Sequence, residues 1–141
     1  AIFARAGLDR VGLIPPHALE LDWMLPAPAQ GAIMVVCRTE DEDIMEGLSA
    51  LNDEQTALCT RVERDFLKTL MGGCSTPIGA LAEIRDGRLH FQGNLLSVDG
   101  RLKVTAEWSG DPSEAGECGI RAADQVLDNG GREILEGLGH A

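Results

Sequence analysis

Two Asp-Gly pairs, Asp86-Gly87 and Asp99-Gly100, constrain the fold of this chain more than any other feature. Both residue types tolerate the positive φ angles of a type I′ turn, so each pair predicts a tight β-hairpin. Around the turns, apolar and polar side chains alternate. The apolar members, expected on one buried face, are Leu89, Phe91, Gly93, Leu95, Leu102, Val104, Ala106 and Trp108. The polar members of the second strand are His90, Gln92 and Asn94. The pattern predicts a half-buried antiparallel meander of three strands.

A helix pattern precedes the meander. Its apolar stripe consists of Leu58, Val62, Phe66 and Leu70. We expect Asn52 to cap this helix, with Gln55 in the capping-box position. The charged side chains expected on its solvent face are Arg61, Glu63, Arg64 and Lys68.

A second helix pattern follows the meander. Asp111 and Pro112 predict its start, because Asp caps a helix and Pro fits the first helical position. Its small inward residues are Ala115, Cys118, Ala122, Ala123, Val126 and Leu127. Asn129-Gly130-Gly131 ends it. The sequence from about residue 52 onward therefore predicts an α+β fold, a three-stranded antiparallel sheet covered on one face by helices.

The first 51 residues give less regular patterns. Ala1 to Leu13 resembles the later part of a helix that Gly12 ends, so we expect the chain to begin inside an element, as a fragment does. The apolar run from Ala32 to Cys37 does not alternate, which is typical of a strand buried on both faces. The alternative is a core strand of the following domain. A short amphipathic helix is expected from Asp41 to Leu51.

Composition excludes several classes of function. A formal charge of −11 disfavours binding to nucleic acid or to an anionic membrane. The longest apolar run is too short to cross a bilayer. The four cysteines form no C-x-x-C pair, so we expect no metal site, and free thiols suit the reducing cytoplasm.

Cys74 lies in a glycine-rich connection between the first helix and the meander. Gly72-Gly73 frees the backbone before it, and Pro77 directs the chain into a strand. A buried structural cysteine and a redox thiol are alternatives. A Cys/His hydrolase is poorly supported, because the preceding helix end disfavours a thiolate and none of the histidines, His17, His90 and His140, lies in a partner motif.

Several linked motifs together resemble the porphobilinogen deaminase family, also called hydroxymethylbilane synthase. Those around the cysteine are Glu63-Arg64, Phe66-Leu67, Leu70, Gly72-Gly73-Cys74 and Pro77-Ile78-Gly79. Those elsewhere are Ala6-Gly7-Leu8 with Arg10 and Gly12, Leu25-Pro26-Ala27-Pro28 with Gln30-Gly31-Ala32, and Gly131 to Leu135. The resemblance spans nearly the whole chain.

The resemblance implies that the chain is the carboxy-terminal part of a longer transferase. Residues 1–27 would close a second α/β domain, residues 28–51 would return a strand and helix to a first, and residues 52–141 would form the cofactor-anchoring domain. The whole enzyme would join four porphobilinogen units into the linear tetrapyrrole hydroxymethylbilane, with release of ammonia, in heme and porphyrin biosynthesis.

The resemblance also assigns site residues. Cys74 would carry a dipyrromethane cofactor through a thioether, Gln30 and Gly31 would lie near that cofactor, and Arg10 would bind substrate carboxylates. Without the resemblance, Arg10 is a surface arginine beside Asp9. The family's catalytic aspartate belongs to the absent part, so we expect no catalytic residue here and an inactive fragment.

Three residues depart from the family pattern. Ala29 stands where glycine is common, Asp9 where lysine is common, and Met71 where an acid is common. The alternative to the enzyme is a non-enzymatic interaction domain that pairs through its exposed strand or sheet face. We further expect the Ala32–Cys37 segment to pair with another copy of the chain or to pack onto the third domain.

Overall fold

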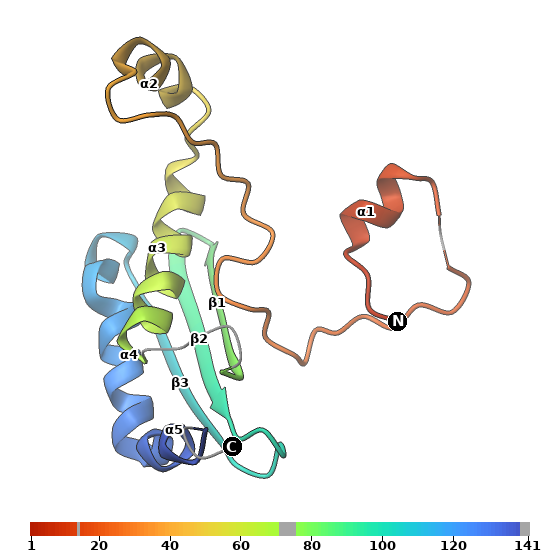
Figure 1. Cartoon of the computed structure of the whole chain (residues 1–141), viewed down its shortest axis with the longest axis vertical. Helices are drawn as coiled ribbons and strands as arrows, with labels where there is room; N and C mark the ends of the chain where they lie inside the picture. Colours follow the sequence, from red (N-terminus) through yellow and green to blue (C-terminus); the bar gives the residue numbers. More distant parts are fainter. Residues whose placement is uncertain (14, 71–75, 139–141) are drawn as a thin grey trace.

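The computed structural model describes residues 1–13, 15–70 and 76–138 (Figure 1). Cys74 and its neighbours from Met71 to Ser75 lie outside them, as does His140. The elements in chain order are α1 (Arg5–Arg10), α2 (Glu42–Ser49), α3 (Glu54–Thr69), β1 (Ile78–Arg85), β2 (Arg88–Leu96), β3 (Lys103–Gly110), the 3₁₀ helix η1 (Pro112–Glu117), α4 (Cys118–Val126), the π turn η2 (Leu127–Gly131) and α5 (Arg132–Leu138). No described helix is long and apolar enough to cross a membrane.

The three strands form one antiparallel sheet in the order β1-β2-β3, which confirms the predicted meander. Asp86 and Gly87 take φ angles of 52° and 73°, as a type I′ turn requires. The second connection is not the tight turn that the sequence predicted. Only Gly100 has a positive φ there, because the Asp99 carboxylate is held by the Ser97 hydroxyl and the Arg101 backbone N–H. The result is a longer loop between Leu96 and Lys103.

Helices α3 and α4 lie on the same face of the sheet, as expected (Figure 1). The covered face carries the alternating apolar residues of the strands, except that Leu102, predicted there, lies in the loop before β3 and is exposed. Phe66 of α3 packs its ring onto Gly93 of β2, where a side chain would collide with the ring. The same ring meets Phe91 edge-on, with ring centroids 5.3 Å apart. Both phenylalanines are buried, so this cluster forms the centre of the core.

The helix starts follow the predicted chemistry with one shift. Asp53, and not Asn52, caps α3, and its side chain accepts a hydrogen bond from the Thr56 backbone N–H at 2.7 Å. Asp53 is therefore the N-cap, because its carboxylate reaches the backbone N–H of the third residue after it. Asp111 caps the next helix as predicted, although its first turn is 3₁₀. Gly130, at φ 105°, breaks that helix before α5.

The amino-terminal third makes few contacts with the sheet. Figure 1 shows α1 and α2 standing away from the layer of α3 and α4. The expected strand from Ala32 to Cys37 does not form, and its large apolar side chains are exposed, with Ile33 at 94%. The reason is physical, because the described residues supply no strand beside this segment with which it could exchange hydrogen bonds.

Close contact between α3 and α4 depends on Gly119. A Cβ there would overlap the backbone carbonyl oxygen of Val62. We predict that Gly119→Ala lowers the free energy of unfolding by about 2 kcal/mol or more, because the helices must separate. The matched control is Gly116→Ala, where a Cβ meets no described atom within 4 Å. Urea unfolding of both variants measures the difference, and equal stabilities would contradict the packing described.

Candidate functional site

The ends of the cysteine loop are well placed by the fold. Leu70 ends α3 and is buried, and Ile78 begins β1 and is buried. Both belong to the core cluster, so the chain on either side of the loop is anchored in the hydrophobic layer. Cys74 therefore follows the C-terminal end of α3 and precedes the edge strand of the sheet, whatever the path between them.

Gln30 and Gly31 form a tight turn with the residues before them. The Gln30 side chain accepts a hydrogen bond from the Ala27 backbone N–H at 3.0 Å, and the Gln30 N–H donates to the Ala27 carbonyl at 3.0 Å. Ala29 and Gly31 have φ angles of 59° and 86°. Ala29 is thus in the left-handed region where a Cβ is unfavourable, so a glycine would adopt this backbone conformation with less strain.

Glu63 fastens this turn to the sheet. One carboxylate oxygen accepts the Ala29 backbone N–H at 2.6 Å, and the other accepts the Ala82 backbone N–H at 2.7 Å. The residue is only 6% exposed. A buried carboxylate needs such donors, because removal from water would otherwise cost several kcal/mol. One side chain of α3 therefore joins the turn to β1.

The turn and the preceding residues cover the free edge of β1. The Ala80 backbone N–H donates to the Pro26 carbonyl at 2.9 Å, and the next outward N–H along the strand, that of Ala82, donates to Glu63. Leu25 passes so close to Gly79 that a Cβ there would lie 2.9 Å from the Leu25 Cβ. These two outward N–H groups of β1 are therefore paired without another strand.

A hollow lies where the turn, α3 and β1 meet. Gln30, Gly31, Thr56, Cys59 and Glu63 are among the residues that line it. Burial raises the pKa of the Cys59 thiol, and the nearby Glu63 and Glu83 carboxylates raise it further, so this cysteine is not a reactive thiolate. The hollow adjoins the N-terminal half of α3, whereas the Cys74 loop follows the other end of that helix.

Arg10 is not brought together with these residues. It is exposed at the end of α1, a six-residue helix that stands apart from the sheet (Figure 1). Its guanidinium is free to meet solvent or another segment. Arg10 and Gln30-Gly31 therefore occupy separate parts of the described chain, and Cys74 lies outside the described residues.

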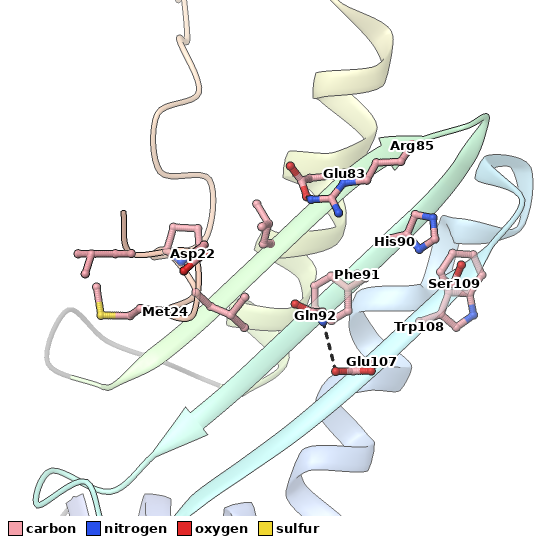
Figure 2. A pocket seen from close by; sticks show the side chains of 14 residues that line it. Asp22, Met24, Glu83, Arg85, His90, Phe91, Gln92, Glu107, Trp108 and Ser109 are labelled. Atoms are coloured by element: carbon pink, nitrogen blue, oxygen red, sulfur yellow. Dashed lines mark hydrogen bonds and ion pairs between the residues drawn. The ribbon is translucent and has the colours of Figure 1, made fainter. Parts of the chain in front are cut away.

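The uncovered face of the sheet carries polar side chains of both signs. Figure 2 shows Glu83, Arg85, His90, Gln92 and Glu107 spread across it, with residues of the amino-terminal segment at one side. Glu83 and Arg85 form an ion pair, and the Gln92 amide donates to Glu107 at 3.3 Å across the strands. Such a mixed surface is not built to collect carboxylates. His90 is exposed, as expected for a surface histidine.

The sequence interpretation of Glu63 was wrong, since it placed this residue on a solvated helix face. A signal was present. Glu63 lies three residues before Phe66 and seven before Leu70, which puts it on the inward side of α3. Asn94, expected on the polar face, is also buried, and its side-chain oxygen accepts the Gly79 backbone N–H at 3.1 Å. Both residues satisfy backbone groups of β1.

A three-stranded antiparallel sheet with helices on one face defines a small α+β domain. Residues 57–128 match the family model "Porphobilinogen deaminase, C-terminal domain", and residues 1–46 match "Porphobilinogen deaminase, dipyromethane cofactor binding domain". The first match covers half of the chain. The chain therefore belongs to the porphobilinogen deaminase family.

Curated relatives agree with this assignment. The chain is 43% identical to porphobilinogen deaminase from Nocardia farcinica over 145 residues, with 95% of this chain and 42% of the relative covered. It is 40% identical to the enzyme of the same name from Carboxydothermus hydrogenoformans over 137 residues, with 96% and 44% covered. The chain thus spans about two fifths of the length of these relatives.

Glu63 gives the site a predictable pH dependence. Burial raises the pKa of its carboxyl above the ordinary 4.5, and this outweighs the lowering by the Ala82 and Ala29 N–H groups. The folded protein then holds this proton more tightly than the unfolded chain does. Its stabilising contribution is complete below pH 4.5 and is lost as pH rises through the raised pKa.

We therefore predict that the free energy of unfolding of the wild type, minus that of Glu63→Gln, falls as pH rises above 4.5. For one proton the slope is at most about 1.4 kcal/mol per pH unit. Urea titrations of both proteins from about pH 4 to about pH 8 measure it. A difference that does not change with pH, or that grows as pH rises, would contradict the buried carboxyl.

Proposed function

We propose that this chain is the carboxy-terminal part of a porphobilinogen deaminase, a transferase that joins porphobilinogen units into hydroxymethylbilane and releases ammonia. The observation that carries the proposal is the pair of family models, matched at residues 1–46 and 57–128. The relatives named porphobilinogen deaminase align with nearly the whole of this chain. These matches do not favour a non-enzymatic interaction domain.

The proposed domain organisation follows the resemblance. Residues 1–27 would end a second α/β domain, residues 28–51 would belong to a first, and residues 52–141 would form the third. The exposed apolar segment from Ala32 to Cys37 supports a strand that completes its hydrogen bonds elsewhere in the whole protein. The compact sheet and helices beyond Asp53 support an independent third domain.

Cys74 is the proposed anchor of a dipyrromethane cofactor, attached through a thioether. Two other thiols fit this role poorly. Cys59 and Cys118 are buried, and burial raises the pKa of Cys118 to about 11. When bound, the cofactor would supply the pyrrole end to which porphobilinogen units are added. The chain's own contribution is a tether between α3 and β1, for which no adjacent base is needed.

Gln30, Gly31 and Arg10 complete the proposed site. The positive φ of Gly31 leaves its backbone open to close approach by a ligand, and Gln30 is exposed beside it. Arg10 would form a forked pair with a substrate carboxylate. In this chain Arg10 lies apart from the Gln30-Gly31 turn, so we propose that the remainder of the enzyme brings the two together.

We propose that the chain by itself is inactive. A polypyrrole carries many carboxylates, which a chain of formal charge −11 would repel. The mixed charges of the uncovered sheet face offer no alternative groove (Figure 2). Mixing the chain with the missing amino-terminal half should restore porphobilinogen consumption; a mixture that stays inactive would favour a binding module.

The described free cysteines further fit a cytoplasmic protein.

The test of this function is the intact mass of the full-length protein. We predict an added dipyrromethane on Cys74, and loss of both the added mass and porphobilinogen consumption in Cys74→Ser. The matched control, Cys37→Ser, changes a thiol that is neither buried nor in the loop and should keep both. An unmodified wild-type protein, or an adduct that survives Cys74→Ser, would refute the assignment.

The exposed apolar segment yields a second prediction. In the isolated chain, residues 32–37 should pair with a second copy, because nothing within the described chain covers them. Val35→Lys places a charge in this segment and should lower the dimer fraction at least tenfold. Sedimentation equilibrium measures the effect. A monomeric wild type at high concentration would refute pairing, and Lys103→Glu on the sheet serves as the control.

A further inference from the structure

Glu63 is the only charged side chain that is buried among the residues described by the structure. Within the described part of the chain, no positively charged side chain pairs with it. The titratable groups that face it are Glu83 of β1 and Cys59 of α3. The turn that covers it from the other side, residues 25–31, contains no ionisable residue. The cost of burying its carboxylate is therefore offset by hydrogen bonds from backbone N–H groups alone.

The two N–H groups come from segments far apart in the sequence. Ala29 belongs to the amino-terminal turn, and Ala82 belongs to β1. The two carboxylate oxygens of Glu63, a residue of α3, thus connect the amino-terminal turn to β1. The turn is also tied directly to β1, through the Pro26 carbonyl and the Ala80 N–H. Two successive outward N–H groups of the strand are therefore used to hold the turn.

We infer that Glu63 is a positioning residue that fixes the Ala27–Gly31 turn against α3 and β1, the two elements between which Cys74 stands in the sequence. This inference deepens the proposed function and rests on it, because it concerns the placement of Gln30 and Gly31 relative to the tether. Helix α3 sets this placement. Glu63 lies seven residues before Leu70, the C-cap of the helix, which corresponds to about 10 Å along the helix axis.

Only glutamate meets the geometry. Both oxygens accept hydrogen bonds, at 2.6 and 2.7 Å, so both atoms must be acceptors. Glutamine has the same reach, but its NH₂ group is a donor and would face one of the two N–H groups. Glu63→Gln therefore releases one bond while preserving shape. The control is Glu54→Gln, the same change on an exposed residue of the same helix.

The first test uses the unmodified chain, so it does not depend on the folding of a variant. In NMR spectra recorded across the titration of the Glu63 carboxyl, the amide proton shifts of Ala29 and Ala82 should change with one common midpoint. The Glu63 side-chain carbon should give the same midpoint. If the Ala82 amide follows the carboxyl while the Ala29 amide does not, the turn is not held by Glu63 and the inference fails.

The second test is hydrogen exchange in the two variants. Glu63→Gln should speed exchange of the Ala29 or the Ala82 amide about tenfold or more, since one charge-assisted bond is lost. Exchange at Phe91, in the centre of the sheet, should stay slow in both variants. Glu54→Gln should leave Ala29 and Ala82 unchanged. Unaltered exchange of both amides in a folded Glu63→Gln protein would overturn the inference.

The third test places the same variants in the full-length protein. Glu63→Gln should keep the covalent mass on Cys74 but lower kcat about tenfold relative to Glu54→Gln, because the turn is displaced and the tether is not. Equal kcat values would refute the positioning role. A wild-type protein without cofactor or turnover would instead refute the proposed function, and the first two tests would still decide whether Glu63 holds the turn.

Discussion

The buried carboxylate of Glu63 is the interaction on which the arrangement of this chain depends. The sheet has an edge at β1, and an uncovered edge leaves backbone N–H groups without partners. Here the amino-terminal segment and one glutamate oxygen take the place of a fourth strand, at Ala80 and Ala82. The other oxygen holds Ala29. The amino-terminal segment is therefore attached to the sheet by the backbone bond between Ala80 and Pro26 and by the side chain of Glu63.

The parts of the fold that depend on local chemistry could be predicted from the sequence. The positive φ angles at Asp86-Gly87, the cap at Asp111 and the apolar alternation of β2 all follow from short-range rules. The failures arise from contacts between distant segments. Glu63 was expected in solvent because its two partners lie 34 and 19 residues away. Residues 32–37 were expected to form a strand because the pattern cannot reveal that no neighbour is present.

The candidate site was predictable only in part, for the same reason. The resemblance proposes Arg10 and Gln30-Gly31 as site residues, yet Arg10 ends α1, which stands away from the sheet (Figure 1), whereas Gln30-Gly31 lies in the turn held against β1. The chain spans about two fifths of its relatives, carries a formal charge of −11, and leaves an apolar segment exposed. All three observations fit the proposed function, in which this part would provide the tether and the remainder would provide the groups that bind an anionic substrate.

The most direct test of the central claim is the NMR scalar coupling across the two hydrogen bonds of Glu63. We predict a measurable coupling from the Glu63 side-chain carboxyl carbon to the amide nitrogens of both Ala29 and Ala82. Coupling to both would place the two segments on one carboxylate in solution. Coupling to Ala82 alone, or to neither amide, would contradict the claim that this side chain joins the amino-terminal turn to the sheet.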